Sequence, residues 1–325
     1  MFTLTQKSIG ITKDLVVTDG NFHTASCCRP RWEVGPNTFY KQEEKQNLSI
    51  LGSYKDKAIA IHCHAYHLDL VLDLLDAWQC ISNRYVFFST DTYEKAQSLD
   101  KLLKRKGEKN YSIKITKNTG RDIAPLLIDW KDEIRDFSIL IHCHTKKSPH
   151  EPTAISWRNA LISATFGNNY LNDKALEYLQ YRNSGLVFPW PPQFMSPIMN
   201  WGKNYYICKQ IMAMLGLKIK QNDLLYFPAG SFFWAKTDAL IPLMDLGLNH
   251  KHFETEPISL DGTLSHALER CIALLPMLEK RTSYATWIGH DFNGYQNGPK
   301  QACIAQLPEN MNINDNVSLI NYYEI

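Results

Sequence analysis

The sequence predicts an α/β fold built on a mainly parallel, Rossmann-like sheet. Between residues 57 and 144, apolar runs of strand length alternate with segments whose apolar residues have helical spacing. Four such alternations are typical of right-handed βαβ units, in which helices cover both faces of a parallel sheet. Ligands of these sheets bind beyond the carboxyl ends of the strands, so functional residues are expected there.

Each expected strand is a short apolar run, and the helices between them are marked by their charges and breaks. The strands of this regular part are 58–65, 84–90, 111–116 and 137–144. The helices that follow the first three are 67–78, 91–107 and 123–136. The helix 91–107 has the clearest signals, with an acidic start, a basic end and Gly107 as its stop.

The second half of the chain is less regular, and its elements are expected at longer intervals. Helices are expected from Trp157 onward and over 171–182, 205–217 and 261–275, and strands over 185–190 and within 226–240. We expect one large domain, residues 56–287, to contain all of these elements. Residues 1–55 lack a clean period and are interpreted as an extension packed on the core, and residues 288–325, polar and rich in Asn, as a loosely packed tail.

Composition excludes several classes of protein. The 35 Lys and Arg against 33 Asp and Glu leave a net charge of +2, too balanced for a nucleic-acid groove. The first residues lack the apolar core of a signal peptide, and no later run approaches membrane-spanning length. The eight cysteines form no CxxC pair, which favours reduced thiols and a cytoplasmic protein.

Polar residues gather at the carboxyl ends of all four regular strands. These clusters are His62–His64, Ser89–Asp91, Asn118–Asp122 and His142–Ser148. Because parallel strands end at one edge of a sheet, the clusters are expected to lie side by side and to form a ligand site.

Two His-x-His pairs, His62/His64 and His142/His144, leave three interpretations open. Residues i and i+2 of a strand face the same way, so each pair could hold a zinc ion. The pairs could instead contact a phosphate or a sugar, or be hydrogen-bonded structural histidines. Lysines follow the second pair, and cations favour phosphate over a metal ion.

Two further segments have residues suited to chemistry. In NTGRD, Arg121 is expected on a phosphate and Asp122 on a ribose or sugar hydroxyl, and the alternative is a helix cap with a solvated arginine. In FETEPISLDGT, Asp261 is expected at a helix N-terminus, either as a simple N-cap or as a general base.

Five motifs, in order, resemble those of the rhamnan synthesis protein F family. They are NTGRDIAPLL, IHCHTKKS, WRNAL, FPAGSFFWAKTDAL and DGTLSHALER, spanning about residues 57–280. The resemblance implies a GT-A-like αβα glycosyltransferase of bacterial polysaccharide or O-antigen (lipopolysaccharide) synthesis. It also implies a nucleotide-sugar donor, typically dTDP-L-rhamnose, and a glycan or lipid-linked glycan acceptor, with possible association with the inner membrane. Ile258 and Ser259 stand where the family commonly has Gly-Gln, which leaves the sugar open.

The resemblance and the strand-end clusters together define the expected site. Lys146 and Lys147 are expected to neutralise the leaving diphosphate where related enzymes use a metal on an Asp-x-Asp turn, and a divalent cation such as Mg²⁺ or Mn²⁺ stays open. The expected donor-binding residues are Ser89, Thr90, Asp91, Asn118, Gly120, Arg121, Asp122, His142, His144, Lys146 and Lys147. The expected acceptor-binding residues are Trp201, Gly230, Ser231 and Trp234, although Trp234 fits a buried core position equally well.

Asp261 is the expected catalytic base of an inverting transfer, with Glu256 as the next candidate and Glu254 and His266 as substitutes. Two other functions compete with this interpretation. One is a metal-dependent hydrolase built on the two His-x-His pairs. The other is a non-catalytic glycan-binding subunit of a polysaccharide assembly complex, which would tolerate the loss of Asp261.

Overall fold

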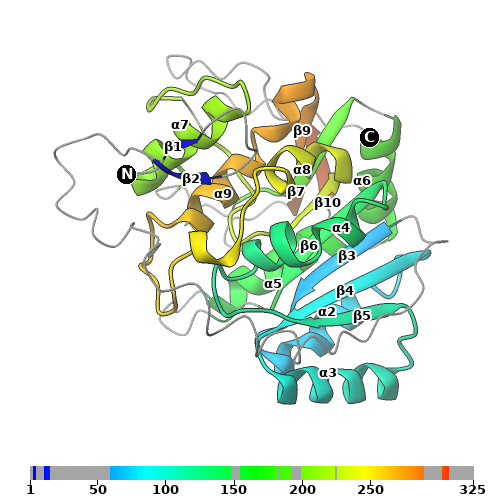
Figure 1. The fold of residues 1–325 in the computed structure, drawn as a ribbon. Helices are drawn as coiled ribbons and strands as arrows, with labels where there is room; N and C mark the ends of the chain where they lie inside the picture. Colours follow the sequence, from blue (N-terminus) through cyan, green and yellow to red (C-terminus); the bar gives the residue numbers. More distant parts are fainter. Residues whose placement is uncertain are drawn as a thin grey trace.

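An eight-stranded sheet forms the centre of the protein (Figure 1). The structure is a computed structural model, and the residues that it describes are 3–4, 11–14, 59–145, 147, 154–167, 169–181, 183–191, 199–223, 225–288 and 302–306. The strand order is β10-β9-β7-β8-β6-β3-β4-β5. Its strands are β3 (Ile59–His64), β4 (Arg84–Thr90), β5 (Tyr111–Ile115), β6 (Ile139–His144), β7 (Ser184–Pro189), β8 (Phe233–Lys236), β9 (Thr282–Ile288) and β10 (Ala302–Gln306). The short strands β1 (Thr3–Leu4) and β2 (Ile11–Asp14) pair separately.

The sheet has a parallel half and a mixed half. Strands β6, β3, β4 and β5 are all parallel, as the sequence predicts. Strand β8 runs antiparallel to both β6 and β7, β9 is parallel to β7, and β10 is antiparallel to β9. The carboxyl ends of β6, β3, β4 and β5 therefore meet at one edge, where the polar clusters were expected.

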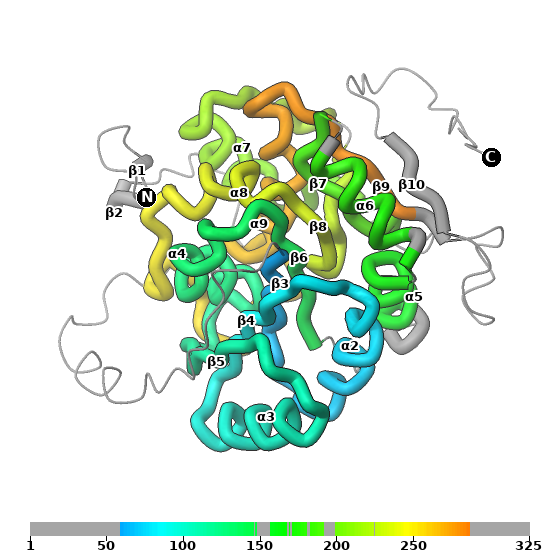
Figure 2. Tube along the Cα trace, turned by 90° about the vertical axis from the view of Figure 1, so that its right-hand side faces the viewer, coloured from blue at the N-terminus to red at the C-terminus, as the bar shows by residue number. Residues whose placement is uncertain are grey.

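Helices cover both faces of the sheet and complete an αβα sandwich, which confirms the predicted GT-A-like fold class (Figure 2). Helices α2, α3, α5 and α6 pack on one face, and α4, α7, α8 and α9 on the other. The helices are α2 (Val71–Ala77), α3 (Tyr93–Lys106), α4 (Lys131–Ile134), α5 (Ala154–Phe166), α6 (Asn169–Tyr181), α7 (Tyr205–Met214), α8 (Thr237–Met244) and α9 (Leu264–Ile272). The shorter helical turns are η2 (Leu68–Leu70), η3 (Pro125–Asp129), η5 (Gly202–Asn204), η6 (His250–His252) and η7 (Leu275–Glu279).

Helix α3 shows how local sequence fixes an element. The Thr92 hydroxyl accepts a hydrogen bond from the Lys95 N–H, so the first turn is capped. Gly107 ends the helix in the left-handed conformation at φ 76°, which only glycine adopts without strain. The apolar residues Ala96, Leu99 and Leu103 face the sheet.

Two expectations about the elements need correction. The predicted helix 123–136 is interrupted at Trp130, where the π-helical turn η3 gives way to α4. The break places the Trp130 indole against the sheet, where its N–H donates to the Phe88 carbonyl at 3.2 Å. The predicted loose tail also contributes the edge strand β10. Most of residues 1–55 lie outside the described residues, so their packing stays a prediction.

Candidate functional site

The polar ends of strands β3, β4 and β6 are in direct register. His62 lies opposite His142 on β6, and His64 lies opposite Ser89 on β4. The His62 and His142 rings are stacked, with centroids 5.0 Å apart and planes 8° from parallel. The parallel register thus places the expected clusters side by side.

Five of these residues form a continuous line of hydrogen bonds. Oδ2 of Asp122 lies 3.1 Å from Nε2 of His142, and Nδ1 of His142 lies 2.9 Å from Nδ1 of His62. Nε2 of His62 lies 3.1 Å from Oγ of Ser89, which lies 2.9 Å from Nδ1 of His64. None of the five is more than 6% exposed. We call this line, Asp122–His142–His62–Ser89–His64, the histidine chain.

The histidine chain has an anionic end and a neutral end. Burial lowers the pKa of His64 to about 4 and that of His62 well below its ordinary value. Burial alone would raise the pKa of Asp122, but the nearby imidazoles, led by His144 and His142, outweigh it and hold this pKa well below its ordinary value. Asp122 is therefore ionised at neutral pH while His64 is uncharged.

The His-x-His pairs are arranged for hydrogen bonding. His62 and His142 face each other, His64 turns to Ser89, and Nε2 of His144 donates to the Gly230 carbonyl at 3.0 Å. Among the residues that the structure describes, no three His, Cys, Asp or Glu side chains are grouped to hold a metal ion. This geometry corresponds to the structural interpretation of the histidines, and the zinc-hydrolase alternative stays a prediction.

Other expected donor-binding residues have partners within the protein. The Thr90 hydroxyl donates to the Ala65 carbonyl at 3.1 Å, so neither it nor the Ser89 hydroxyl is turned to solvent. Asp91 pairs with Lys95 at 2.6 Å. Ser89 and Thr90 are both buried in the sheet, and their contact with the base or ribose stays a prediction.

The two lysines after β6 differ in what the structure describes of them. The Lys147 ammonium pairs with Asp69 at 2.6 Å, and 43% of its side chain is exposed. Lys146 lies outside the described residues. Their role at a diphosphate stays a prediction, and Lys147 would have to exchange Asp69 for the phosphate.

The loop after β5 is docked on the segment before α9. Thr119 forms an isolated antiparallel bridge with Thr255, and its hydroxyl lies 2.9 Å from Nδ1 of His250. Gly120 has φ 68°, and a Cβ there would lie 2.6 Å from the Phe253 ring, so the close approach requires glycine. Asn118 in this loop is exposed.

Arg121 and Asp122 point to different partners. Asp122 belongs to the buried histidine chain, and because its carboxylate bonds to His142 the alternative helix cap needs correction. Its predicted contact with a ribose or sugar hydroxyl stays a prediction. The exposed Arg121 reaches across to the α9 side, where its Nε lies 3.5 Å from Oε1 of Glu256 and its Nη1 lies 3.4 Å from Nε2 of His266. The cation thus joins the strand edge to the carboxylates before α9.

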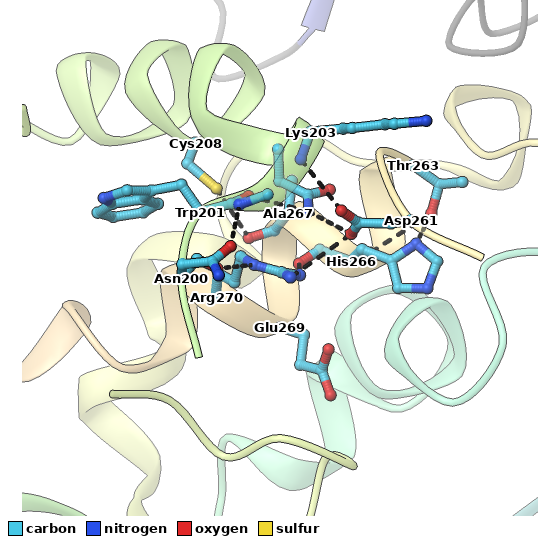
Figure 3. Close-up of polar contacts among 12 residues, drawn as sticks. Asn200, Trp201, Lys203, Cys208, Asp261, Thr263, His266, Ala267, Glu269 and Arg270 are labelled. Carbon is cyan, nitrogen blue, oxygen red and sulfur yellow. Dashed lines mark hydrogen bonds and ion pairs between the residues drawn. The ribbon is translucent and has the colours of Figure 1, made fainter. Parts of the chain in front are cut away.

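Asp261 links the start of α9 to the start of α7 (Figure 3). Its Oδ2 accepts from the Lys203 N–H at 3.0 Å, and its Oδ1 accepts from the Asn204 amide at 2.6 Å. The Arg270 guanidinium lies 3.5 Å from Oδ1. Burial opposes ionisation, but these hydrogen bonds and Arg270 together lower the pKa of Asp261 below its ordinary value.

The predicted N-cap role of Asp261 is wrong. Thr263 is the N-cap of α9, because its hydroxyl accepts from the His266 N–H. Burial, reinforced by the charge of Arg121, lowers the pKa of His266 to about 4, so this ring is neutral at pH 7. Whether Asp261 is the base stays a prediction, and the structure adds that it also anchors α7.

Two further carboxyl groups stand near this cluster. Burial raises the pKa of Glu254, and the charge of Glu256 adds to the shift. Among the described residues, Oε2 of Glu254 has no hydrogen-bond partner although it is buried. Glu269 accepts from the Gly230 N–H at 2.8 Å and from the Ser231 hydroxyl at 3.2 Å. Sequence reasoning missed Glu269, and its position three residues after His266 on α9 is the signal that could have found it.

The expected acceptor-binding tryptophans are buried. Trp234 is 1% exposed and donates its indole N–H to the Thr165 carbonyl at 2.8 Å. This position is the buried core position that the sequence allowed as the alternative. Trp201 is 4% exposed and donates to the Asp223 carbonyl at 3.0 Å. Neither offers a ring face to a sugar in this arrangement, so the stacking prediction needs correction because both rings are enclosed by the core.

Fold and edge together define an αβα protein with polar side chains gathered at the carboxyl ends of parallel strands. The sequence profile of the rhamnan synthesis protein F family matches residues 15–281, and this chain therefore belongs to that family, which is linked to polysaccharide synthesis. The match begins at residue 15 and not near residue 57, so much of the predicted N-terminal extension lies within the family's sequence.

Two curated relatives are similar over part of their length. Both are called "Uncharacterized protein WxcX" and come from two strains of Xanthomonas campestris pv. campestris. Each is 29% identical over 214 residues, which is 65% of this chain and 30% of the relative. No solved structure gives a significant match. Among the described residues, no helix is both long and apolar enough to cross a bilayer.

Proposed function

We propose that this protein is an inverting glycosyltransferase that moves a sugar from a nucleotide sugar to a bacterial surface polysaccharide or O-antigen acceptor. Membership of a family linked to rhamnan synthesis favours L-rhamnose, carried by dTDP, as the donor sugar. The reaction would take place in the cytoplasm, at the inner face of the membrane if the acceptor is lipid-linked. Nucleic acid is not a partner in this proposal.

The observation that carries the proposal is the junction at Arg121. The bridge between Thr119 and Thr255 joins the edge of the parallel strands to the segment that holds the carboxylates. Arg121 lies at this junction, 3.5 Å from Glu256 and exposed to solvent. A cation and carboxylates at one ligand-accessible edge are the groups that transfer from a diphosphate requires.

The proposed chemistry is a single in-line displacement. The acceptor oxygen forms a bond to the anomeric carbon while the bond from that carbon to the diphosphate oxygen breaks. A carboxylate takes the proton of the acceptor hydroxyl, and Asp261 is the first candidate because it is ionised at neutral pH, with Glu256 second. Arg121 and Lys147 stabilise the charge that develops on the leaving diphosphate.

This scheme assigns the neutralisation of the diphosphate to side chains, and it leaves a divalent cation open. A chelator assay tests that part directly. Retained turnover in EDTA supports neutralisation of the diphosphate by side chains. If turnover is lost in EDTA and returns when Mg²⁺ or Mn²⁺ is added, a divalent cation neutralises the diphosphate instead.

A thermal-shift screen with dTDP, UDP, GDP and CMP sugars tests the proposed function. A ligand that binds only the folded state raises its stability with the logarithm of ligand excess, so one nucleotide class should raise the Tm. We expect dTDP-L-rhamnose to give the largest shift and Arg121→Gln to reduce it. The exposed, helical Arg105→Gln serves as a matched control and should leave the shift unchanged. Absence of a shift with every nucleotide sugar would contradict the proposal.

A further inference from the structure

The histidine chain is a continuous line of hydrogen bonds between buried side chains. It crosses three strands, from Asp122 beside β6 to His64 at the end of β3, and all of its members are nearly or fully buried. Each link joins groups whose donor and acceptor roles depend on the link before it. The direction of the whole line can therefore be derived from one end.

The derivation starts at the carboxylate. Ionised Asp122 can only accept, so Nε2 of His142 donates to it, and with a single proton on the His142 ring its Nδ1 is bare. That bare nitrogen accepts from Nδ1 of His62, which leaves Nε2 of His62 as an acceptor.

The second half of the chain continues in the same direction. The Ser89 hydroxyl donates to Nε2 of His62, and its oxygen accepts from Nδ1 of His64. Nε2 of His64 is then without a proton, at the carboxyl end of β3. Among the described residues this nitrogen has no hydrogen-bond partner.

We propose that the Asp122 carboxylate, acting through the histidine chain, fixes His64 as a hydrogen-bond acceptor that takes an N–H or O–H donor of the nucleotide sugar. The inference rests on the proposed function for the identity of the ligand, but not for the direction of the chain. His64 is then a ligand-binding residue and Asp122 a positioning residue. The surroundings of His64 suit a polar ligand, since Tyr66 and the Asp91–Lys95 ion pair lie beside it.

The chain predicts an unusual effect of Asp122→Asn. If the new amide N–H donates to Nε2 of His142, the proton of that ring moves to Nδ1, and every later link reverses. Nε2 of His64 then carries a proton and becomes a donor, although no atom of His64 has been changed. A purely structural role of Asp122 would not alter the tautomer of a ring four hydrogen bonds away.

Nitrogen-15 NMR of the full chain labelled at histidine measures these tautomers without any ligand. In the wild type we expect His64 protonated at Nδ1 and bare at Nε2, and in Asp122→Asn we expect the opposite. The matched control is Asp129→Asn, because Asp129 also pairs with a histidine, His250, that contacts a hydroxyl. It should leave His64 unchanged.

A second variant keeps the test decisive if Asp122→Asn does not fold. Ser89→Ala removes the link between His62 and His64, so His64 loses its imposed tautomer and Nε2 should become protonated. A wild-type His64 that is protonated at Nε2, or a His64 tautomer unchanged in both variants, would overturn the proposed direction.

Calorimetric titration with dTDP tests the ligand. Reversal should cost one hydrogen bond and weaken binding to Asp122→Asn roughly tenfold, with Asp129→Asn close to the wild type. Equal affinity of the wild type and Asp122→Asn would overturn the role of His64. Failure of the wild type to bind any nucleotide would overturn the proposed function instead, while the NMR result would still decide the direction of the chain.

Discussion

The strand edge and the carboxylate cluster before α9 are both polar, but they are built in opposite ways. At the strand edge, the histidine chain is buried and consists mostly of neutral rings that satisfy one another. Before α9, charged groups are partly exposed: 32% of the Asp261 side chain and 28% of Glu256, beside Arg121, which reaches them from the loop after β5 and is 43% exposed. The first region is suited to holding groups in fixed directions, and the second to exchanging charge with a ligand.

The difference separates positioning from chemistry. A buried hydrogen-bonded network is rigid and loses its order when one member is removed. Half-exposed charges keep access to substrate. We therefore expect substitutions before α9 to change turnover most, and substitutions at the strand edge to change stability, pH dependence and donor affinity.

The largest expected effect is that of Asp261→Asn on turnover. The substitution keeps the shape and removes the base, so turnover should fall by roughly 10²–10⁴-fold while donor binding survives. Because Asp261 also anchors α7, the Tm must be measured beside the rate. Asp223→Asn is a control, since the Asp223 side chain holds only a surface turn through the Lys220 N–H. Near-normal turnover in Asp261→Asn would show that Asp261 is not the base. Loss of turnover in Glu256→Gln alone would assign the role of base to Glu256.

Trp234→Ala should change stability and not acceptor binding. Truncating a fully buried indole costs about 3–5 kcal/mol of unfolding free energy, which urea denaturation can measure. Trp190→Ala is the matched control, because Trp190 is half-buried against Tyr226 and should cost clearly less. A raised acceptor half-saturation constant in a Trp234→Ala protein of unchanged stability would contradict the core position.

Stability should fall in mild acid because His64 is buried without a charge. The folded-state pKa of His64 is about 4 against an ordinary 6.5, so the unfolded chain binds the extra proton between these values and stability is lost as pH falls from 6.5 to 4. The linked loss for this one ring is roughly 3 kcal/mol. Urea midpoints at pH 7 and pH 5 should differ less in His64→Asn than in the wild type, and an equal difference would refute the assignment.

Lys147→Ala should have the smallest effect. Its ammonium is partly exposed and already paired with Asp69. A contact with the diphosphate therefore contributes less binding free energy than a buried charged hydrogen bond would. We expect donor affinity to fall about three- to tenfold in calorimetry. Lys104→Ala, which breaks an exposed pair with Asp100 on α3, should leave the affinity unchanged. Equal affinity of Lys147→Ala and the wild type would exclude the contact.

Sequence reasoning predicted the parallel half of the fold because its signals are local. Apolar runs mark β3 to β6, and Thr92 and Gly107 at the ends of α3 act within a few residues. The sheet order was not accessible in the same way. Strand β8 inserts between β6 and β7 through contacts that no short sequence window contains.

The sequence predicted where the polar residues gather, but not which of them are hydrogen-bonded to one another. The i, i+2 spacing shows that His62 and His64 share a face, yet their partners are 80 and 25 residues away. Asp261 was predicted as a cap because it precedes a helix, whereas its hydrogen bonds go to Lys203 and Asn204, more than 50 residues earlier. Such pairings follow from packing, which is why the cap assignment failed.

A crystal structure with bound dTDP tests the central claim most directly, namely that one ligand is held by the strand edge and faces the carboxylates before α9. The account predicts the nucleotide across the carboxyl ends of β3 to β6, with its diphosphate within hydrogen-bonding distance of Arg121 or Lys147 and Asp261 on the opposite side of the sugar position. A nucleotide bound beyond the reach of His64, Arg121 and Lys147 would contradict it.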